Sequence, residues 1–373
     1  MHDITRRKLD QIDALYPAER LAASKARWTR LWHGEAPTDR YPFTFAPLGV
    51  NYYAGDQEPE RSLHAQLDEI IARGEIQDDF IPSFFPGCRQ STMPSLFGAA
   101  EVIIDGDYSC ERLETLDLPA PDFGPGTVAH RWLEIEAYVL EETEGRLPIH
   151  PADSQGPADV CGKLFGYEAL LAAAYDEPER YHAVMGQVTD AFITYWEAQR
   201  RVCGDRFVGT HLWAWNWVPA DAGASISVDS LVMISPDFYT EFYQPHLQRI
   251  GEAFGGMAVH ACGDFAGVVR AVCATPTMKA VNAGEMTVSA LHDAGMDAHT
   301  IIIAGAGLDT LDDVFARIRT DRLRVDLNLY GLWPWLESGL KPTEAWDADD
   351  CAAMARIFDR VQALATDTAA SWR

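Results

Sequence analysis

The sequence lacks long apolar runs, and this absence excludes several classes of protein. No run of about 18 apolar residues occurs in the 373 residues, so no membrane-spanning helix is expected. The stretch from Met1 to Lys8 has neither the apolar segment nor the cleavage site of a secretory signal. The seven cysteines are odd in number, scattered, and free of any C-x-x-C pair. We therefore expect a reduced, cytoplasmic protein.

Positive charge is also scarce. The chain has 30 lysines and arginines against 56 acidic residues, which gives a net charge of −26. Such a surface repels phosphate backbones and anionic lipids, which argues against nucleic-acid and membrane partners. No G-x-G-x-x-G follows the first predicted strand, so a dinucleotide-binding start is not indicated. Without a linker or a low-complexity segment, residues 1–373 are expected to form one domain.

Alternating strand and helix patterns predict the fold. Apolar residues at helical spacing over 3–34 predict helices, which make residues 1–40 an N-terminal cap or a homodimer contact. The remaining chain alternates apolar strands with helices, which indicates a parallel sheet covered by helices. The predicted strands are 41–48, 79–85, 146–150, 206–213, 256–261, 278–283, 299–304 and 322–328. Eight strands favour a (β/α)8 TIM barrel, with a small insertion after the second strand that contains a strand over 99–105.

A candidate metal motif ends the fifth predicted strand. Side chains two positions apart in an extended chain share a face, so His260 and Cys262 can direct a nitrogen and a sulfur at one point. Imidazole and thiolate together suit zinc. Glu285 follows the sixth strand and supplies an oxygen, which leaves one zinc position open. The alternative is that Cys262 is a small buried residue and His260 hydrogen-bonds locally.

Polar residues recur at the carboxyl ends of the predicted strands, where TIM barrels carry their chemistry. Buried polar groups at such positions are costly unless they are paired or functional. We expect catalytic roles for Asp264 and His211. The residues expected to bind substrate are Tyr52, Arg89, His150, Asp153, Trp213, Trp215 and Asn328. The tryptophans at every second position also fit a sheet face that packs on a helix.

One segment carries a family resemblance. The run Ile234-Ser-Pro-Asp-Phe-Tyr-Thr-Glu-Phe-Tyr-Gln-Pro245, a following helix, and then His260-Ala-Cys-Gly-Asp264 resemble the uroporphyrinogen decarboxylase superfamily. The likeness covers roughly residues 40–365 and is most specific over 230–290. Within that superfamily, the His-x-Cys pair is similar to the zinc motif of methyltransferases that move methyl groups between corrinoid proteins and thiols.

The resemblance implies a chemistry as well as a barrel. The separation of His260, Cys262 and Glu285 also resembles cobalamin-independent methionine synthase, whose zinc lowers the pKa of a thiol substrate. A corrinoid protein is implied as a partner, because this chain has no visible cobalamin domain. The methyltransferases carry a further cysteine after the last strand, and the stretch Leu323–Tyr330 has none. The implied fourth ligand is therefore open, with His211 and Asn328 as candidates.

Three functions are compatible with these residues. The first is a zinc-dependent methyltransferase or demethylase that acts on a small methylated substrate, with a thiol or corrinoid acceptor. The second is a metal-independent decarboxylase or lyase, in which Asp153, Asp264 or Glu285 protonates a carbanion that a histidine orients. The third is a non-catalytic binder of a small ligand. A porphyrinogen substrate would need several cations, and Arg89 is the one basic residue in the loop after strand two.

Overall fold

The computed structural model describes residues 1–45, 58–104, 107–210, 216–307, 309–329 and 348–372. Its centre is a six-stranded sheet in the order β1-β8-β7-β6-β5-β4. The strands are β1 (Phe43–Phe45), β4 (Ala224–Ser227), β5 (Met257–Ala261), β6 (Met278–Ala283), β7 (Ile301–Ala306) and β8 (Val325–Leu329). Every neighbouring pair is parallel, as the continuous apolar strands predicted.

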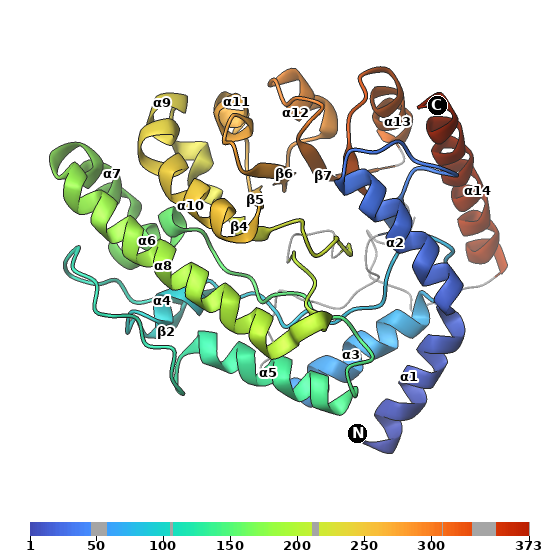
Figure 1. Cartoon of the computed structure of the whole chain (residues 1–373), viewed down its shortest axis with the longest axis horizontal. Coiled ribbons are helices and arrows are strands. Elements are labelled where there is room, and N and C mark those ends of the chain that lie inside the picture. The colour runs from blue at the N-terminus through green and yellow to red at the C-terminus, as the bar shows by residue number, and fades with distance from the viewer. Residues whose placement is uncertain (46–57, 105–106, 211–215, 308, 330–347, 373) are drawn as a thin grey trace.

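Helices surround this sheet on its outer side (Figure 1). They alternate with the strands along the second half of the chain, which is the order expected for parallel strands joined by crossover helices. The helices are α1 (Asp3–Leu15), α2 (Ala18–Trp32), α3 (Pro59–Ala72), α4 (Thr92–Ser95), α5 (Val128–Glu142), α6 (Pro157–Phe165), α7 (Tyr167–Asp176), α8 (Pro178–Cys203), α9 (Pro236–Phe238), α10 (Gln244–Phe254), α11 (Val269–Cys273), α12 (Val288–Asp293), α13 (Leu311–Thr320) and α14 (Ala348–Ser371). No helix in the described ranges is both long and apolar enough to cross a membrane.

The segments around Phe84, Ile149 and Phe207 form the wall of the fold between β1 and β4. They are joined by single bridges rather than by ladders. Phe84 pairs with Ile149, and Ile149 pairs with Phe207, both in parallel. The Asp79 N–H donates to the Phe43 carbonyl at 3.0 Å, which joins this wall to β1. The described residues therefore form a TIM-like arrangement without a closed barrel. The predicted strands 79–85 and 146–150 are wrong in extent, and so is the described part of 206–213, because the pairing there reaches little beyond these bridges. Residues 211–213 of the last prediction lie outside the described residues.

Strand β4 was not predicted, because Ala-Ser-Ile-Ser contains a single large apolar residue. Gly223 sets its start: this residue has a φ of +94°, and a Cβ there would lie 2.0 Å from the Gly256 carbonyl oxygen. Only glycine permits such an approach. The Ala224 N–H then donates to that same carbonyl at 3.0 Å and begins the pairing with β5.

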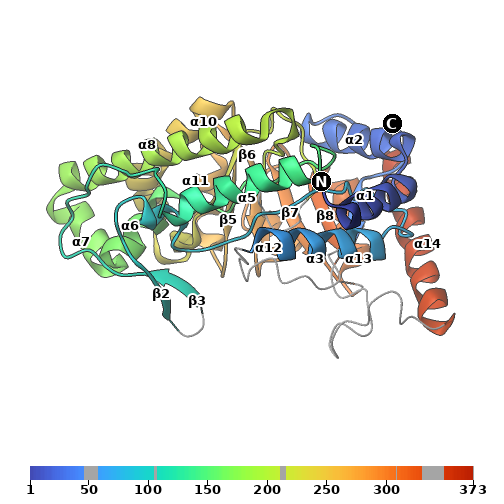
Figure 2. The ribbon, with the colours of Figure 1, turned by 90° about the horizontal axis from the view of Figure 1, so that it is seen from below.

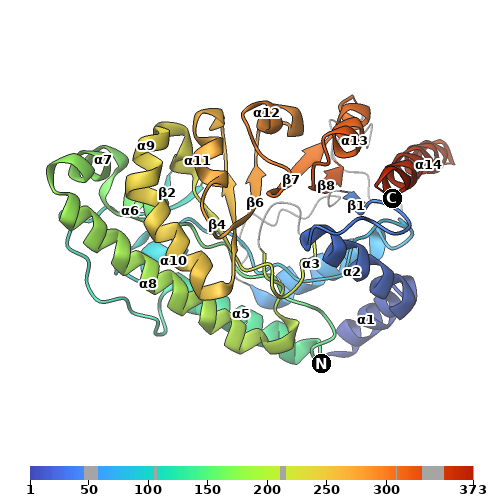
Figure 3. The ribbon, with the colours of Figure 1, turned by 45° about the horizontal axis from the view of Figure 1, so that its top comes forward.

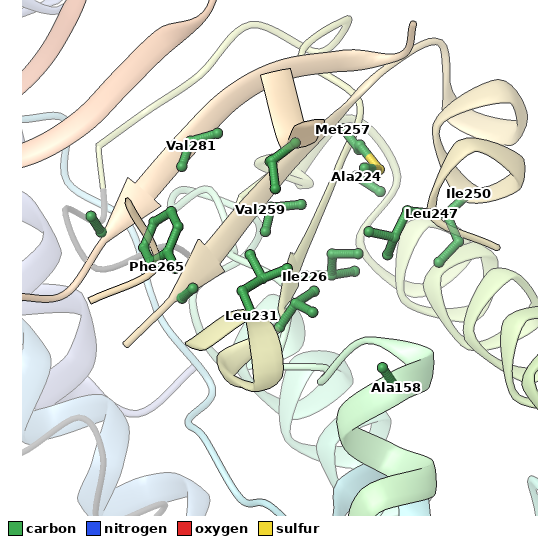
Figure 4. Packing of buried hydrophobic residues seen from close by; sticks show 14 of the residues in the cluster. Ala158, Ala224, Ile226, Leu231, Leu247, Ile250, Met257, Val259, Phe265 and Val281 are labelled. Carbon is green, nitrogen blue, oxygen red and sulfur yellow. The ribbon is translucent and has the colours of Figure 1, made fainter. Parts of the chain in front are cut away.

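The core behind these strands positions the carboxyl ends of β4 and β5. Ile226 and Val259 pack with Leu247 of α10 and with Leu231 (Figure 4), and all four are buried. Burial of one such side chain stabilises the fold by about 1.5–3 kcal/mol. Ser235 opens the α9–α10 segment, since its hydroxyl accepts the Phe238 N–H at 3.2 Å.

Two peripheral parts complete the fold. The insertion is a hairpin of β2 (Glu101–Ile104) and β3 (Asp107–Cys110), which confirms a strand near 99–105 and adds an antiparallel partner. Figure 2 shows this hairpin projecting from the body near α6 and α7. The predicted N-terminal helices are confirmed as α1 and α2, which lie at one end of the arc near α3 (Figure 3).

Candidate metal centre

Three donor side chains converge at the carboxyl ends of β4 and β5. His260 Nε2 lies 3.2 Å from Cys262 Sγ and 3.6 Å from Asp229 Oδ1. One ligand atom from each residue lies within 4.8 Å of the other two. His260 is buried within β5, whereas Cys262 and Asp229 are partly exposed. The structure thus brings together the predicted His-x-Cys pair and adds an oxygen donor that the sequence had not suggested.

Asp229 is held in place by its own turn. It begins the 3-10 helix Asp229–Met233 directly after β4, and the buried Leu231 anchors that turn in the core. Its Oδ1 accepts the Cys262 N–H at 2.9 Å, which ties the turn to the end of β5. Asp159 of α6 in turn accepts the backbone N–H groups of Asp229 at 2.5 Å and Ser230 at 3.1 Å. Burial, and then the charge of Asp229, raise the pKa of Asp159 to about 6.

Asn282 sets the orientation of the His260 ring. These residues are neighbours across β5 and β6, and Asn282 Oδ1 lies 2.6 Å from His260 Nδ1. Asn282 Nδ2 donates to the Ile303 carbonyl at 2.8 Å, which fixes the amide so that its oxygen faces the histidine. The Nδ1 atom must then carry the proton, and the lone pair lies on Nε2, the nitrogen nearest Cys262 and Asp229. Metal-binding histidines are oriented in this way by a neighbouring acceptor.

The carboxylates at and beside the three donors have no basic side chain as a partner among the described residues. Burial raises the pKa of the Cys262 thiol to about 12, and the carboxylates of Asp229 and Glu285 add to this rise. Among the described residues, no lysine or arginine forms an ion pair with Asp229 or Glu285, and the ring nitrogen that lies 3.6 Å from Asp229 belongs to the neutral His260. A divalent metal would supply the missing positive charge and bind the sulfur as a thiolate. Nitrogen, sulfur and oxygen donors from three residues form a set that zinc accepts.

Glu285, the predicted third ligand, lies beside the group rather than within it. Its carboxylate accepts the Gly263 N–H, which holds the loop after Cys262 against the loop after β6. It also lines a pocket of about 220 Å³ at the ends of β6 and β7. The pocket lies close to two of the three donors, since a Cβ on its lining residue Gly284 would lie 3.4 Å from Cys262 Sγ and 3.6 Å from His260 Cε1.

Asp153, predicted to bind substrate, connects three segments near the centre. Its carboxylate accepts the Cys88 thiol at 2.7 Å and the Ser227 hydroxyl at 3.2 Å, and its N–H donates to Gly87 at 3.0 Å. It is near enough to Cys262 for its charge to contribute to the raised pKa of that thiol. Ser227 is also the β4 neighbour of His260. Asp153 therefore lies next to the candidate metal group, which is the set Asp229, His260 and Cys262.

Two other predicted residues make contacts within the wall and the insertion. His150 is fully buried, with Nε2 at 2.8 Å from the Ser83 hydroxyl and Nδ1 at 2.5 Å from the Thr210 carbonyl. It thus ties three segments of the wall together. The Arg89 guanidinium pairs with Glu101 at 2.6 Å and stacks over Tyr108 at 3.6 Å, so the hairpin neutralises its charge.

Of the remaining predicted residues, two lie in the described part of the chain and the others lie outside it. Asp264 is exposed, and its carboxylate accepts the Ala266 N–H at 3.0 Å as a local cap. Asn328 is buried in β8 beside Gly305, a residue of the pocket lining. The predicted residues outside the described part of the chain are Tyr52, His211, Trp213 and Trp215.

Sequence reasoning missed Asp229, Asp159 and Asn282. Asp229 follows β4, which was not predicted because its residues are mostly small. The available signal was an aspartate shortly after a run of small residues that follows a glycine. Asp159 lies in a helix and reaches the centre only through the fold. Asn282 had a clearer signal, because it is a polar residue near the end of an otherwise apolar predicted strand.

Comparison with known proteins identifies a shared fold. Among solved structures, the chain is similar to a methyltransferase from Methanosarcina mazei, with a TM-score of 0.60 and 14% sequence identity. The match covers 90% of this chain and 98% of that one. No family model matches the sequence, and no curated protein does. At this identity the similarity shows that the two chains fold alike.

Proposed function

We propose that this protein is a zinc-dependent methyltransferase of the uroporphyrinogen decarboxylase-like superfamily, with Asp229, His260 and Cys262 as the metal ligands. The observation that carries the proposal is the convergence of their three donor atoms within 4.8 Å at adjoining strand ends. The methyltransferase with the same fold supports it, as does the likeness of the His-x-Cys pair to a methyltransferase zinc motif. Three protein donors leave one zinc position open for a substrate atom, as in catalytic zinc sites.

The chain's own residues prepare the site for this chemistry. Asn282 holds His260 with Nε2 free to bind, and Asp229 supplies negative charge while it fixes the Cys262 backbone. Bound zinc would act as a Lewis acid that lowers the pKa of a thiol acceptor. Methyl transfer to such a thiol would form the bond from sulfur to the methyl carbon, break the bond from that carbon to the donor with its electron pair left on the donor, and release the thiol proton to solvent. A thiol or a partner corrinoid protein is the proposed acceptor.

The charges around the site favour this function over decarboxylation. A substrate carboxylate needs a cation in the site, and the Arg89 guanidinium is already paired with Glu101. Asp229, Glu285 and Asp153 lie around the candidate centre instead, and they would repel a carboxylated substrate.

Elemental analysis of the purified protein tests the proposal. After zinc loading and desalting, wild type is expected to retain about one zinc per chain, and Cys262→Ala to lose it together with methyl transfer to a thiol. Cys273→Ala is the matched control, because this half-buried cysteine lies on α11, outside the donor group. Equal zinc contents in wild type and Cys262→Ala would reject the assigned ligands.

A further inference from the structure

The pocket beside the metal group has one charged side chain in its lining. The lining residues are Asn282, Ala283, Gly284, Glu285, Met286, Thr287 and Gly305. Glu285 is the charged one; Asn282 and Thr287 are polar, and Ala283, Met286 and the two glycines complete the uncharged part of the wall. The pocket volume of about 220 Å³ is below the range of sites for drug-sized ligands, so its ligand is small.

The negative charge of Glu285 is not needed to neutralise a divalent ion in the candidate metal group. In the proposed centre, a divalent ion is neutralised by the Asp229 carboxylate and the Cys262 thiolate, with a neutral His260. The Glu285 carboxylate accepts the Gly263 N–H, a dipole that stabilises its negative charge without cancelling it. Within the described part of the chain, no lysine or arginine forms an ion pair with Glu285. The negative charge of Glu285 therefore lies in the lining of a small pocket close to Cys262 and His260.

We propose that Glu285 selects a small methylated cation, an ammonium or a sulfonium, as the methyl donor. This inference rests on the proposed function. The carboxylate attracts the positive nitrogen or sulfur, and the uncharged remainder of the lining leaves room for methyl groups. When the methyl carbon bonds to the acceptor thiolate, its bond to the donor breaks, and the electron pair left on nitrogen or sulfur makes that atom neutral. The donor leaves as an amine or a thioether.

The position of the charge predicts a kinetic signature. Glu285 stabilises a full positive charge in the bound donor, and this charge disappears as the methyl group departs. Its contribution is therefore to ground-state binding rather than to the transition state. Glu285→Gln is expected to raise KM for a cationic donor about tenfold while kcat stays unchanged or rises, which is the pattern of lost ground-state binding.

Binding of an isosteric pair of probes tests the inference without turnover. Choline and 3,3-dimethylbutan-1-ol differ in that a quaternary nitrogen replaces a carbon. Titration calorimetry on zinc-loaded wild type is expected to show choline bound about tenfold more tightly, with a preference that shrinks as salt rises. Glu285→Gln should bind both probes equally. Asp309→Asn is the matched control, since it removes the same charge from an exposed residue outside the pocket lining and should keep the preference.

Zinc content, measured on the same samples, separates this inference from the proposed function. Wild type that takes up no zinc would overturn the proposed function. Wild type that holds zinc but binds the two probes equally would overturn the role of Glu285 alone. A Glu285→Gln protein that loses its zinc would show that Glu285 is a metal ligand, which also contradicts the present assignment.

Discussion

Carboxylates lie at both ends of the parallel sheet, and the two ends neutralise them differently. At the amino end, Asp79 is fully buried and pairs with Arg27 at 2.8 Å and with Arg40 at 2.5 Å. Asp78, also buried, pairs with Arg73 at 2.8 Å. These arginines come from α2 and from the segments just before β1 and after α3. The charges at this end are balanced within the chain itself.

At the carboxyl end, the described residues supply no such balance. Asp229 lies 3.6 Å from the neutral His260 ring, and among the described residues neither Asp229 nor Glu285 has an arginine or lysine partner. The same residue type therefore serves two purposes in one sheet. Charges matched within the protein hold the amino end together, whereas charges left unmatched at the carboxyl end are available to a ligand. This division agrees with the general placement of stability and chemistry in barrels.

The largest expected effect on stability comes from removing the buried ion pairs at the amino end of the sheet. Asp79→Ala would leave Arg27 and Arg40 without their buried partner and would remove an acceptor of the Phe43 N–H. Removal of one partner of a buried pair is expected to lower the free energy of unfolding by about 3–5 kcal/mol. Urea unfolding measures this change.

Asp39→Ala is the control for that experiment. Asp39 also pairs with Arg27, but its side chain is 54% exposed, so the expected loss is about 0–1 kcal/mol. Zinc content per folded chain should be the same in both variants, because neither touches the carboxyl end. Equal destabilisation by the two substitutions would contradict the structural role assigned to the buried pair.

A smaller effect is expected from the residue that supports the metal group. Asn282→Ala removes the acceptor that keeps the proton on His260 Nδ1. Loss of such a support is expected to weaken zinc binding about 10–100-fold, measured by competition with a chelator of known affinity. Ser289→Ala, a change at a partly buried residue of the nearby α12 whose hydroxyl donates to Asp313, should bind zinc like wild type. An unchanged zinc affinity in Asn282→Ala would show that the Asn282 amide does not set the orientation of the His260 ring.

The smallest effect concerns a third kind of carboxylate, which has neither an arginine nor a candidate metal. Glu136 of α5 is fully buried, and within the described residues no arginine, lysine or histidine forms an ion pair with it. The groups that face it are the Cys203 thiol, the Ala152 backbone and Tyr195. Burial raises the pKa of Glu136 well above its usual value, so this carboxyl retains its own proton.

The sign of the pH effect follows from that shift. In the unfolded chain the pKa of a glutamate is about 4.3. Below that pH both states are protonated, and the contribution of Glu136 to stability is fully present; as pH rises toward the raised folded pKa, it is lost. Glu136→Gln should therefore raise the melting temperature relative to wild type by more at about pH 8 than at about pH 5. Glu141→Gln, exposed on the same helix, should show no such trend. A difference between Glu136→Gln and wild type that is equal at both pH values would mean that Glu136 is not buried as a neutral acid.

Local patterns in the sequence determined the parallel sheet, the N-terminal helices, the start at Ser235 and the His260–Cys262 pair. Each of these depends on residues that are close in sequence: apolar strands, helical spacing, a capping hydroxyl, and side chains two apart on one strand. The insertion was predicted for the same reason, although its second strand was not.

Only the tertiary structure decided which oxygen joins that pair. Asp229 and Glu285 both follow a strand next to β5, so sequence distance could not choose between them. The choice depends on β4, a strand of small residues that is recognisable only by its pairing with β5 and by the close approach of Gly223 to Gly256. Asp159 and Asn282 likewise act through contacts between separate elements. The sequence carries the donor atoms, but their convergence depends on strand register and turn geometry, which long-range packing sets.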